Sequence, residues 1–369
     1  MKKTIILVSR LLVGIVFVFS GFVKGVDPLG TAYRVEDYFI VFHLPGHSSL
    51  FLLLSILLCT FEFTLGVLLL LNMRRTMVSW FLLLIMSFFT LTTFYDALYN
   101  PVPDCGCFGD AIKLTNWQTF LKNILLFIPV IILFLHRKKA VRPFSRLYES
   151  IISAVVVFAF VFFSLYNYLT LPLIDFLPWK VGSKVTVDNS APPTVYLTYK
   201  NLKTDEMKEF LSSELPYNDS VWMNSWEFVK QRVVSELPEA GTMLQISDTL
   251  GNDVTNSFLQ NSDYQFLLIA YDLNLTRGKA FKKINQIFQK AEGDGYSFIA
   301  LYSNGNPVEF AHKVNANYEF YTADDVMLKM LVRSNPGLVL LKNGVVIAKW
   351  SYFTLPDYYK IKAAYIKKH

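Results

Sequence analysis

The sequence predicts an α-helical membrane bundle followed by an α/β domain outside the lipid. Of its 369 residues, 53% are hydrophobic and only 17% are charged, whereas soluble domains carry about 25% charged residues. The apolar excess lies before residue 180, and the remainder of the chain alternates short apolar strands with amphipathic helices. The chain therefore divides into a membrane part and a globular part, with a boundary near Trp179.

Five apolar segments approach or exceed the length of about 20 residues that a membrane-spanning helix needs. They cover residues 4–22, 49–71, 77–97, 117–135 and 150–171. The first segment follows Met1-Lys2-Lys3, as a secretory signal would, but its apolar stretch is long and no small-residue cleavage site follows it. We therefore expect it to be retained as a span.

The basic residues predict the orientation of the spans, because cytoplasmic loops carry an excess of Lys and Arg. With a cytoplasmic N-terminus, only Lys24, Arg34 and Lys113 lie in the opposite loops. The globular domain is then periplasmic and the protein lies in the inner (plasma) membrane. The same bias accounts for the net charge of +6, so we expect no nucleic-acid binding. The basic residues on the cytoplasmic side are Lys2, Lys3, Arg74, Arg75, Arg137, Lys138, Lys139, Arg142 and Arg146.

Ionisable residues in the spans are costly and often functional. Arg10, Lys24, Glu62 and Asp96 form the candidate polar site of the membrane part. Arg10 lies near the inner surface, where snorkelling to the headgroups is an equal alternative. Glu62 lies too deep to snorkel, so we expect it to be protonated or paired. A structural clasp and a role as proton relay or ligand both remain open for it.

A family resemblance is carried by the first two predicted spans. Its residues are Arg10, Gly14, Ser20, Gly21, Lys24, Asp27, Pro28, Glu62 and Gly66. This pattern resembles the DoxX/MauE superfamily, which implies a four-helix membrane domain over residues 1–136 with a link to periplasmic redox processes. Residues 137–179 are then a cytoplasmic loop and a fifth span.

The loop between the third and fourth predicted spans carries Cys105 and Cys107, the candidate catalytic pair. Thiols outside the cytoplasm tend to form disulfides. A ring between these two requires a bend that Gly106 permits, and a strained disulfide is more oxidising. A static clip is an alternative, as is an approach to Cys59, which is otherwise a small buried residue. A metal site is disfavoured because further His or Cys ligands at suitable spacing are missing.

Residues 104–109 resemble the CGCFG loop of the MauE branch, whose members serve in the maturation of methylamine dehydrogenase and its disulfides. The resemblance implies a periplasmic protein partner and leaves its identity open.

The globular part begins with a connector, residues 180–240. It contains an expected hairpin, with strands at 195–199 and 206–210, and then a helix-rich or irregular stretch to Val234. Periodicity in residues 241–369 predicts an α/β domain. Its expected elements are strands 266–272 and 297–302, helices 279–291 and 324–332, a hairpin of strands 338–341 and 345–350, and a last helix from 356.

Two segments of this domain resemble the thioredoxin-like fold of the TlpA/peroxiredoxin type. They are the entry hairpin 248–255 and the segment 334–344, with its proline, strand and Lys-x-Gly turn. The resemblance implies that Pro336 is the cis-proline beside the active site. However, residues 271–278 stand where the Cys-x-x-Cys belongs, and the domain has no Cys. We therefore expect a redox-silent binding module, because fold alone does not confer activity.

Two functions are consistent with these observations. In the first, the bundle relays oxidising equivalents between Cys105/Cys107 and a quinone-like acceptor, which would be its cofactor. In the second, the protein is a non-enzymatic envelope scaffold and the Cys pair is a static clip. We favour a DoxX/MauE-type membrane factor linked to thiol–disulfide redox or to the maturation of a periplasmic partner. A transporter ranks third, because no internal repeat is evident.

Overall fold

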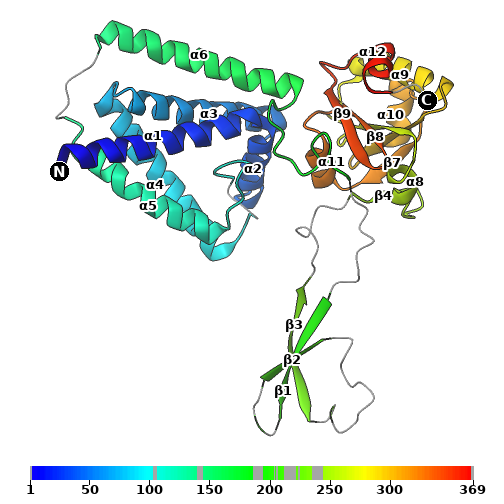
Figure 1. The fold of residues 1–369 in the computed structure, drawn as a ribbon, viewed down its shortest axis with the longest axis horizontal. Coiled ribbons are helices and arrows are strands. Elements are labelled where there is room, and N and C mark those ends of the chain that lie inside the picture. The colour runs from blue at the N-terminus through cyan, green and yellow to red at the C-terminus, as the bar shows by residue number, and fades with distance from the viewer. Residues whose placement is uncertain are drawn as a thin grey trace.

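The structure is a computed structural model that describes residues 2–102, 106–138, 144–185, 194–202, 204, 207–211, 222, 225–234 and 244–366. Within these ranges, five helices are long and apolar enough to cross a bilayer, which implies a multi-pass membrane protein (Figure 1). They are α1 (Lys2–Val26), α3 (Ser48–Leu70), α4 (Arg75–Tyr99), α5 (Asn116–Leu135) and α6 (Arg146–Thr170). The five predicted spans are confirmed, with ends that move by no more than four residues.

Helices α1 and α3 pack closely because glycines replace larger side chains at their contact. A Cβ atom on Gly21 would lie 2.6 Å from the backbone nitrogen of Phe63, and one on Gly66 would lie 2.6 Å from that of Val18. Small residues at such positions let two membrane helices approach to backbone contact. This approach fixes how the polar side chains of α1 and α3 face each other.

A short helix, α2 (Pro28–Val41), follows α1 and was not predicted. Asp27 caps it by accepting a hydrogen bond from the backbone N–H of Gly30 at 2.9 Å, and Pro28 occupies the first turn. Both features favour a helix start. Helix α2 lies at the end of the bundle that faces the globular domain (Figure 1). We call this the domain-facing end and the opposite one the distal end.

The globular domain contains a six-stranded sheet in the order β4-β7-β6-β5-β8-β9. Strands β5, β6 and β7 are parallel, whereas β4, β8 and β9 run antiparallel to their neighbours. The strands are β4 (Ile246–Ser247), β5 (Tyr264–Ile269), β6 (Ser297–Tyr302), β7 (Phe320–Ala323), β8 (Gly337–Lys342) and β9 (Val345–Ser351). The helices are α8 (Thr255–Leu259), α9 (Phe281–Gly293), α10 (Pro307–Val314), α11 (Asp325–Leu331) and α12 (Tyr358–Tyr365). The predicted mixed α/β architecture is confirmed. The structure also contains α8, α10 and β7, which were not predicted.

The sheet is buried on both faces, so the core of this domain has two layers. Along β5, Phe266 and Leu268 pack into the cluster formed with α9 and α12. Leu267 and Ile269 point to the other face and pack with α8, α11 and Trp179. Successive strand residues face opposite sides, and a strand covered on both sides is therefore largely apolar.

A separate three-stranded sheet has the order β2-β1-β3. The expected hairpin is confirmed as β1 (Thr194–Asn201) and β2 (Met207–Leu211). The stretch expected to be helical or irregular is instead strand β3 (Trp226–Val234), which pairs antiparallel with β1. Its sequence is rich in Val and aromatic residues, which favour strands when a partner edge is present. That prediction was wrong because the partner edge is not visible in the sequence.

Candidate functional site

A buried ion pair lies between α1 and α3. The Lys24 Nζ atom lies 2.6 Å from Oε1 and 2.7 Å from Oε2 of Glu62, and the two side chains are 5% and 1% exposed. Charges so far from water persist only when they are paired. Of the two expectations for Glu62, protonation or pairing within the bundle, the structure shows pairing, and the partner is Lys24.

The cysteine loop reaches this ion pair through Ser20. The Ser20 hydroxyl lies 2.8 Å from Glu62 Oε2 and 2.7 Å from the carbonyl oxygen of Cys107. A hydroxyl has one hydrogen, so it donates to one of these acceptors at a time. Cys107 and Cys59 both lie close enough to Lys24 to interact with it electrostatically. The loop thus brings Cys107 to the buried pair, with Cys59 nearby.

A small cavity adjoins these residues. Lys24, Glu62, Ser20 and Cys107 are among the side chains that line it, and its volume is about 20 Å³. This is enough for about one water molecule, which needs polar partners of this kind. We call Ser20, Lys24, Glu62 and Cys107 the polar centre.

Aromatic packing holds the loop against the bundle. The ring of Phe108 lies 5.5 Å from that of Phe19, and the Lys122 Nζ atom lies 4.5 Å from its centroid. The backbone turns where the Gly109 N–H donates to the Gly106 carbonyl, with positive φ at both residues. Glycine adopts this conformation without steric cost, so the chain can turn around Cys107 itself.

The globular domain docks next to this loop through one arginine. Arg333 Nε lies 2.8 Å from Asp27 Oδ2, and Arg333 Nη2 lies 2.8 Å from Asp110 Oδ2. Asp27 caps α2 and Asp110 ends the cysteine loop, so a single 6% exposed guanidinium joins three segments. Burial opposes the charge of Arg333, but the carboxylates of Asp27 and Asp110 outweigh it and raise its pKa. Arg34 Nη2 also contacts Asp110, at 3.2 Å.

A pair of tyrosines forms a second contact between the two parts. The hydroxyl oxygens of Tyr33 in α2 and Tyr271 after β5 lie 3.0 Å apart. Burial raises the pKa of Tyr271 to about 12, so its hydroxyl stays neutral. Tyr271 begins the segment where the thioredoxin-like resemblance places a Cys-x-x-Cys. That end of the sheet therefore faces α2.

Pro336 lies close to the same contact. The Asn335–Pro336 peptide bond is cis, and the Asn335 side chain donates to the carbonyl of Asp272 at 2.8 Å. Thr276 donates to the Asn335 side chain at 2.9 Å. These bonds join the loop before β8 to the segment after β5. The role of Pro336 as a thioredoxin-type proline stays a prediction.

The other predicted site residues lie apart. Arg10 is fourteen positions before Lys24 in α1, which is about 21 Å along the helix axis. Asp96 is fully buried in α4 and accepts a hydrogen bond from the Tyr38 hydroxyl at 2.6 Å. Cys105 falls outside the described residues, so its pairing with Cys107 stays a prediction. Of the predicted set, the structure brings together Lys24, Glu62 and Cys107.

The sequence analysis missed six residues of this region: Ser20, Asp27, Tyr33, Asp110, Tyr271 and Arg333. Asp27 was noticed only as part of the family motif, and Asp110 directly follows the segment 104–109 that resembles the MauE loop. Their position directly beside the helix exit and the cysteine loop was the available signal. Nothing in the sequence separates Arg333 from other basic residues, because its partners lie more than two hundred positions away.

One comparison with known proteins gives a match to the membrane part. Residues 2–136 match the family of methylamine utilisation protein MauE. The match covers α1 to α5 with the cysteine loop, which is just over a third of the chain. No curated protein and no solved structure matches the chain significantly. The thioredoxin-like identification of residues 241–369 therefore stays a prediction. Among the described residues, no group of three His, Cys, Asp or Glu side chains could hold a metal ion.

Proposed function

We propose that this MauE-like protein takes part in thiol–disulfide chemistry on the periplasmic side of the membrane, with Cys105 and Cys107 as the reacting pair. The observation that carries the proposal is the position of Cys107 beside the Lys24–Glu62 pair: its carbonyl lies 2.7 Å from the Ser20 hydroxyl, and it lines the same small cavity as Lys24, with which it interacts electrostatically. A neighbouring ammonium group favours the thiolate form of a cysteine, which is the nucleophile in disulfide exchange.

The proposed reaction begins with an oxidised pair. A thiolate of a periplasmic partner attacks the Cys105–Cys107 disulfide and forms a mixed disulfide, which the partner's second thiol then resolves. The partner gains a disulfide and this protein keeps two thiols. Their re-oxidation releases two electrons and two protons, and a membrane quinone that becomes a quinol is the proposed acceptor.

The proposed topology supports this location. The basic residues assign the distal end of the bundle to the cytoplasm, so the cysteine loop and the globular domain lie together on the opposite side. The globular domain supplies no cysteine. Its proposed role is to cover the loop through Arg333 and to present a surface to the partner protein.

Trapping the thiols in intact cells tests the redox role. We expect Cys105 and Cys107 to change between disulfide and thiols when a reductant is added and removed, and Cys105→Ser to abolish activity toward the partner. A pair that stays oxidised throughout, together with a tolerated Cys105→Ser, would contradict the proposal.

Alkylation kinetics test the role of Lys24. In a Cys59→Ala, Cys105→Ser background, Cys107 is the remaining thiol. We expect Lys24→Gln to slow its alkylation at neutral pH by several-fold, because the thiolate loses its cation. Lys3→Gln, a distant change of the same kind, serves as the control. Equal rates in the two variants would remove the chemical basis of the proposal.

A non-enzymatic scaffold is the second candidate, and a specific observation favours it. The end of the sheet at Tyr271 and Arg333 is occupied by contacts with the membrane part. A scaffold would keep its function in Cys105→Ser and lose it when Arg333 is replaced. The redox factor would show the loss in both variants.

A further inference from the structure

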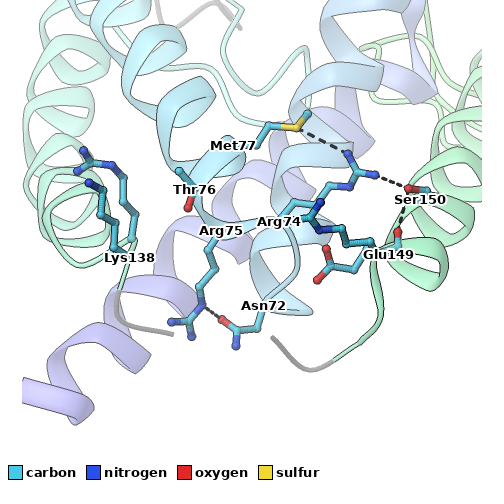
Figure 2. A pocket seen from close by; sticks show the side chains of 10 residues that line it. Asn72, Arg74, Arg75, Thr76, Met77, Lys138, Glu149 and Ser150 are labelled. Atoms are coloured by element: carbon cyan, nitrogen blue, oxygen red, sulfur yellow. Dashed lines mark hydrogen bonds between the residues drawn. The ribbon is translucent and has the colours of Figure 1, made fainter. Parts of the chain in front are cut away.

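A basic pocket lies at the distal end of the bundle, far from the polar centre. It is formed by the turn between α3 and α4, the end of α5 and the start of α6, and its volume is about 410 Å³ (Figure 2). One carboxylate, Glu149, is among its lining residues. Five basic side chains line it: Arg74, Arg75, Arg137, Lys138 and Arg146.

The cations of this pocket lack anionic partners in the part of the chain that the structure describes. None of the five forms an ion pair with another residue that the structure describes. Arg74 donates to the Ser150 hydroxyl at 2.5 Å (Figure 2), and Arg137 donates to the Phe134 carbonyl at 2.7 Å. The Nε atoms of both arginines are buried and have no hydrogen-bond partner among the described residues. Buried donors are normally satisfied, so these two indicate a missing acceptor.

Other charged residues near the pocket do not neutralise its five cations. Glu149 is 4% exposed and its Oε1 atom has no hydrogen-bond partner among the described residues. One carboxylate cannot neutralise five cations. Arg10 interacts electrostatically with Arg75 and so adds a further positive charge to the region. The positive potential of the pocket is therefore largely uncompensated.

We propose that this pocket binds a phosphate-bearing anion, the headgroup of an anionic phospholipid. Guanidinium groups bind phosphate oxygens through charge-assisted hydrogen bonds. The pocket lies at the ends of membrane-spanning helices, which is the level of lipid headgroups. The Arg137 guanidinium also lies over the rings of Phe134 and Trp80, at 3.9 and 5.6 Å from their centroids. Tryptophan is typical of this interfacial layer.

Lipid binding to the full-length protein tests the proposal. Purified protein in phosphatidylcholine nanodiscs is titrated with phosphatidylglycerol, and retained lipid is counted by native mass spectrometry. We expect selective retention of phosphatidylglycerol, and affinity at least about tenfold lower in Arg74→Gln and in Arg137→Gln, because each loses a charged hydrogen-bond donor. Lys3→Gln removes the same charge at the distal end outside the pocket, and we expect no change in it.

The controls separate the proposed site from simpler explanations. An equal loss in Lys3→Gln would overturn the proposal in favour of diffuse surface charge. Inorganic phosphate that binds as tightly as phosphatidylglycerol would overturn the lipid assignment and leave a free-anion site. Arg74→Lys keeps the charge without the planar fork, and we expect it to fall between wild type and Arg74→Gln. Melting temperatures in pure phosphatidylcholine show whether each variant is folded.

Discussion

Replacement of Arg333 by Met tests how the globular domain is held on the membrane part. Met has a similar length but no charge, so the change removes both ion pairs and leaves most of the packing. Asp110 keeps its contact with Arg34. Asp27 keeps the Gly30 N–H at Oδ1, whereas Oδ2 loses the arginine. The substitution therefore takes the guanidinium away from two largely buried carboxylate oxygens, Oδ2 of Asp27 and Oδ2 of Asp110.

The magnitude follows from the burial of this cluster. Removal of one partner from a buried ion pair costs about 3 to 5 kcal/mol. The side chains of Asp27 and Asp110 are 10% and 12% exposed, and Asp110 retains a partner. We therefore expect the lower value, about 3 kcal/mol, which shifts the docking equilibrium more than about a hundredfold toward the released domain.

Hydrogen–deuterium exchange in nanodiscs measures this shift. We expect faster exchange in α2 and in the segment after β5, which contact each other through Tyr33 and Tyr271. The exposed Arg277 provides the control Arg277→Met, in which exchange should stay at the wild-type rate. Adding Asp27→Asn and Asp110→Asn to Arg333→Met should restore part of the protection, because neither position then holds a carboxylate that has lost Arg333. Unchanged exchange of α2 in Arg333→Met would refute the argument.

Three further predictions concern stability. Gly21→Ala should destabilise the bundle by about 1 to 3 kcal/mol, because the added Cβ would press on the α3 backbone. A Cβ on Gly293 would meet open space, so Gly293→Ala serves as the control and should leave the melting temperature unchanged. Equal melting temperatures of the two variants would contradict the prediction. Phe266→Ala should destabilise the globular domain by about 3 to 5 kcal/mol in chemical denaturation, since Phe266 is fully buried. The Asp294 carboxylate accepts hydrogen bonds from Lys362 and Tyr358 of α12, and these lower its pKa. The contact therefore stabilises α12 fully above about pH 4, the ordinary pKa of Asp. This stabilisation is lost as the pH falls through the lowered pKa of Asp294, and amide exchange of α12 then becomes faster. Asp294→Asn should abolish this pH dependence of α12 amide exchange.

The sequence was most informative where a pattern is local. Apolar length alone located the five spans, because a helix in lipid satisfies its own backbone hydrogen bonds and needs no partner to be recognised. The hairpin through Asn343 and Gly344 was equally clear, since both residues have the positive φ that such a turn requires. Helix α9 showed its buried face by the spacing of Phe281, Ile284, Ile287 and Phe288.

The elements that were missed depend on distant partners. Strand β3 has a strand-like composition, but it becomes a strand by pairing with β1, about thirty positions earlier. Helix α2 was hidden because its start signal, Asp27-Pro28, was treated only as a family motif. Its first turns also contain Gly30 and Thr31, which are weak helix formers in isolation.

For the candidate site, the sequence by itself determined which residues had to be explained. It identified Glu62 as a charge that needs a partner in the membrane and the cysteine loop as a place of chemical interest, because those residue types are costly or reactive wherever they occur. Tertiary structure decided the assembly. It selected Lys24 as the partner of Glu62 and brought Cys107 to that pair. In the folded protein, Arg333 also joins the globular domain to the same loop. These contacts arise from helix packing and domain docking, which bring together residues far apart in the chain and leave no local signal in the sequence.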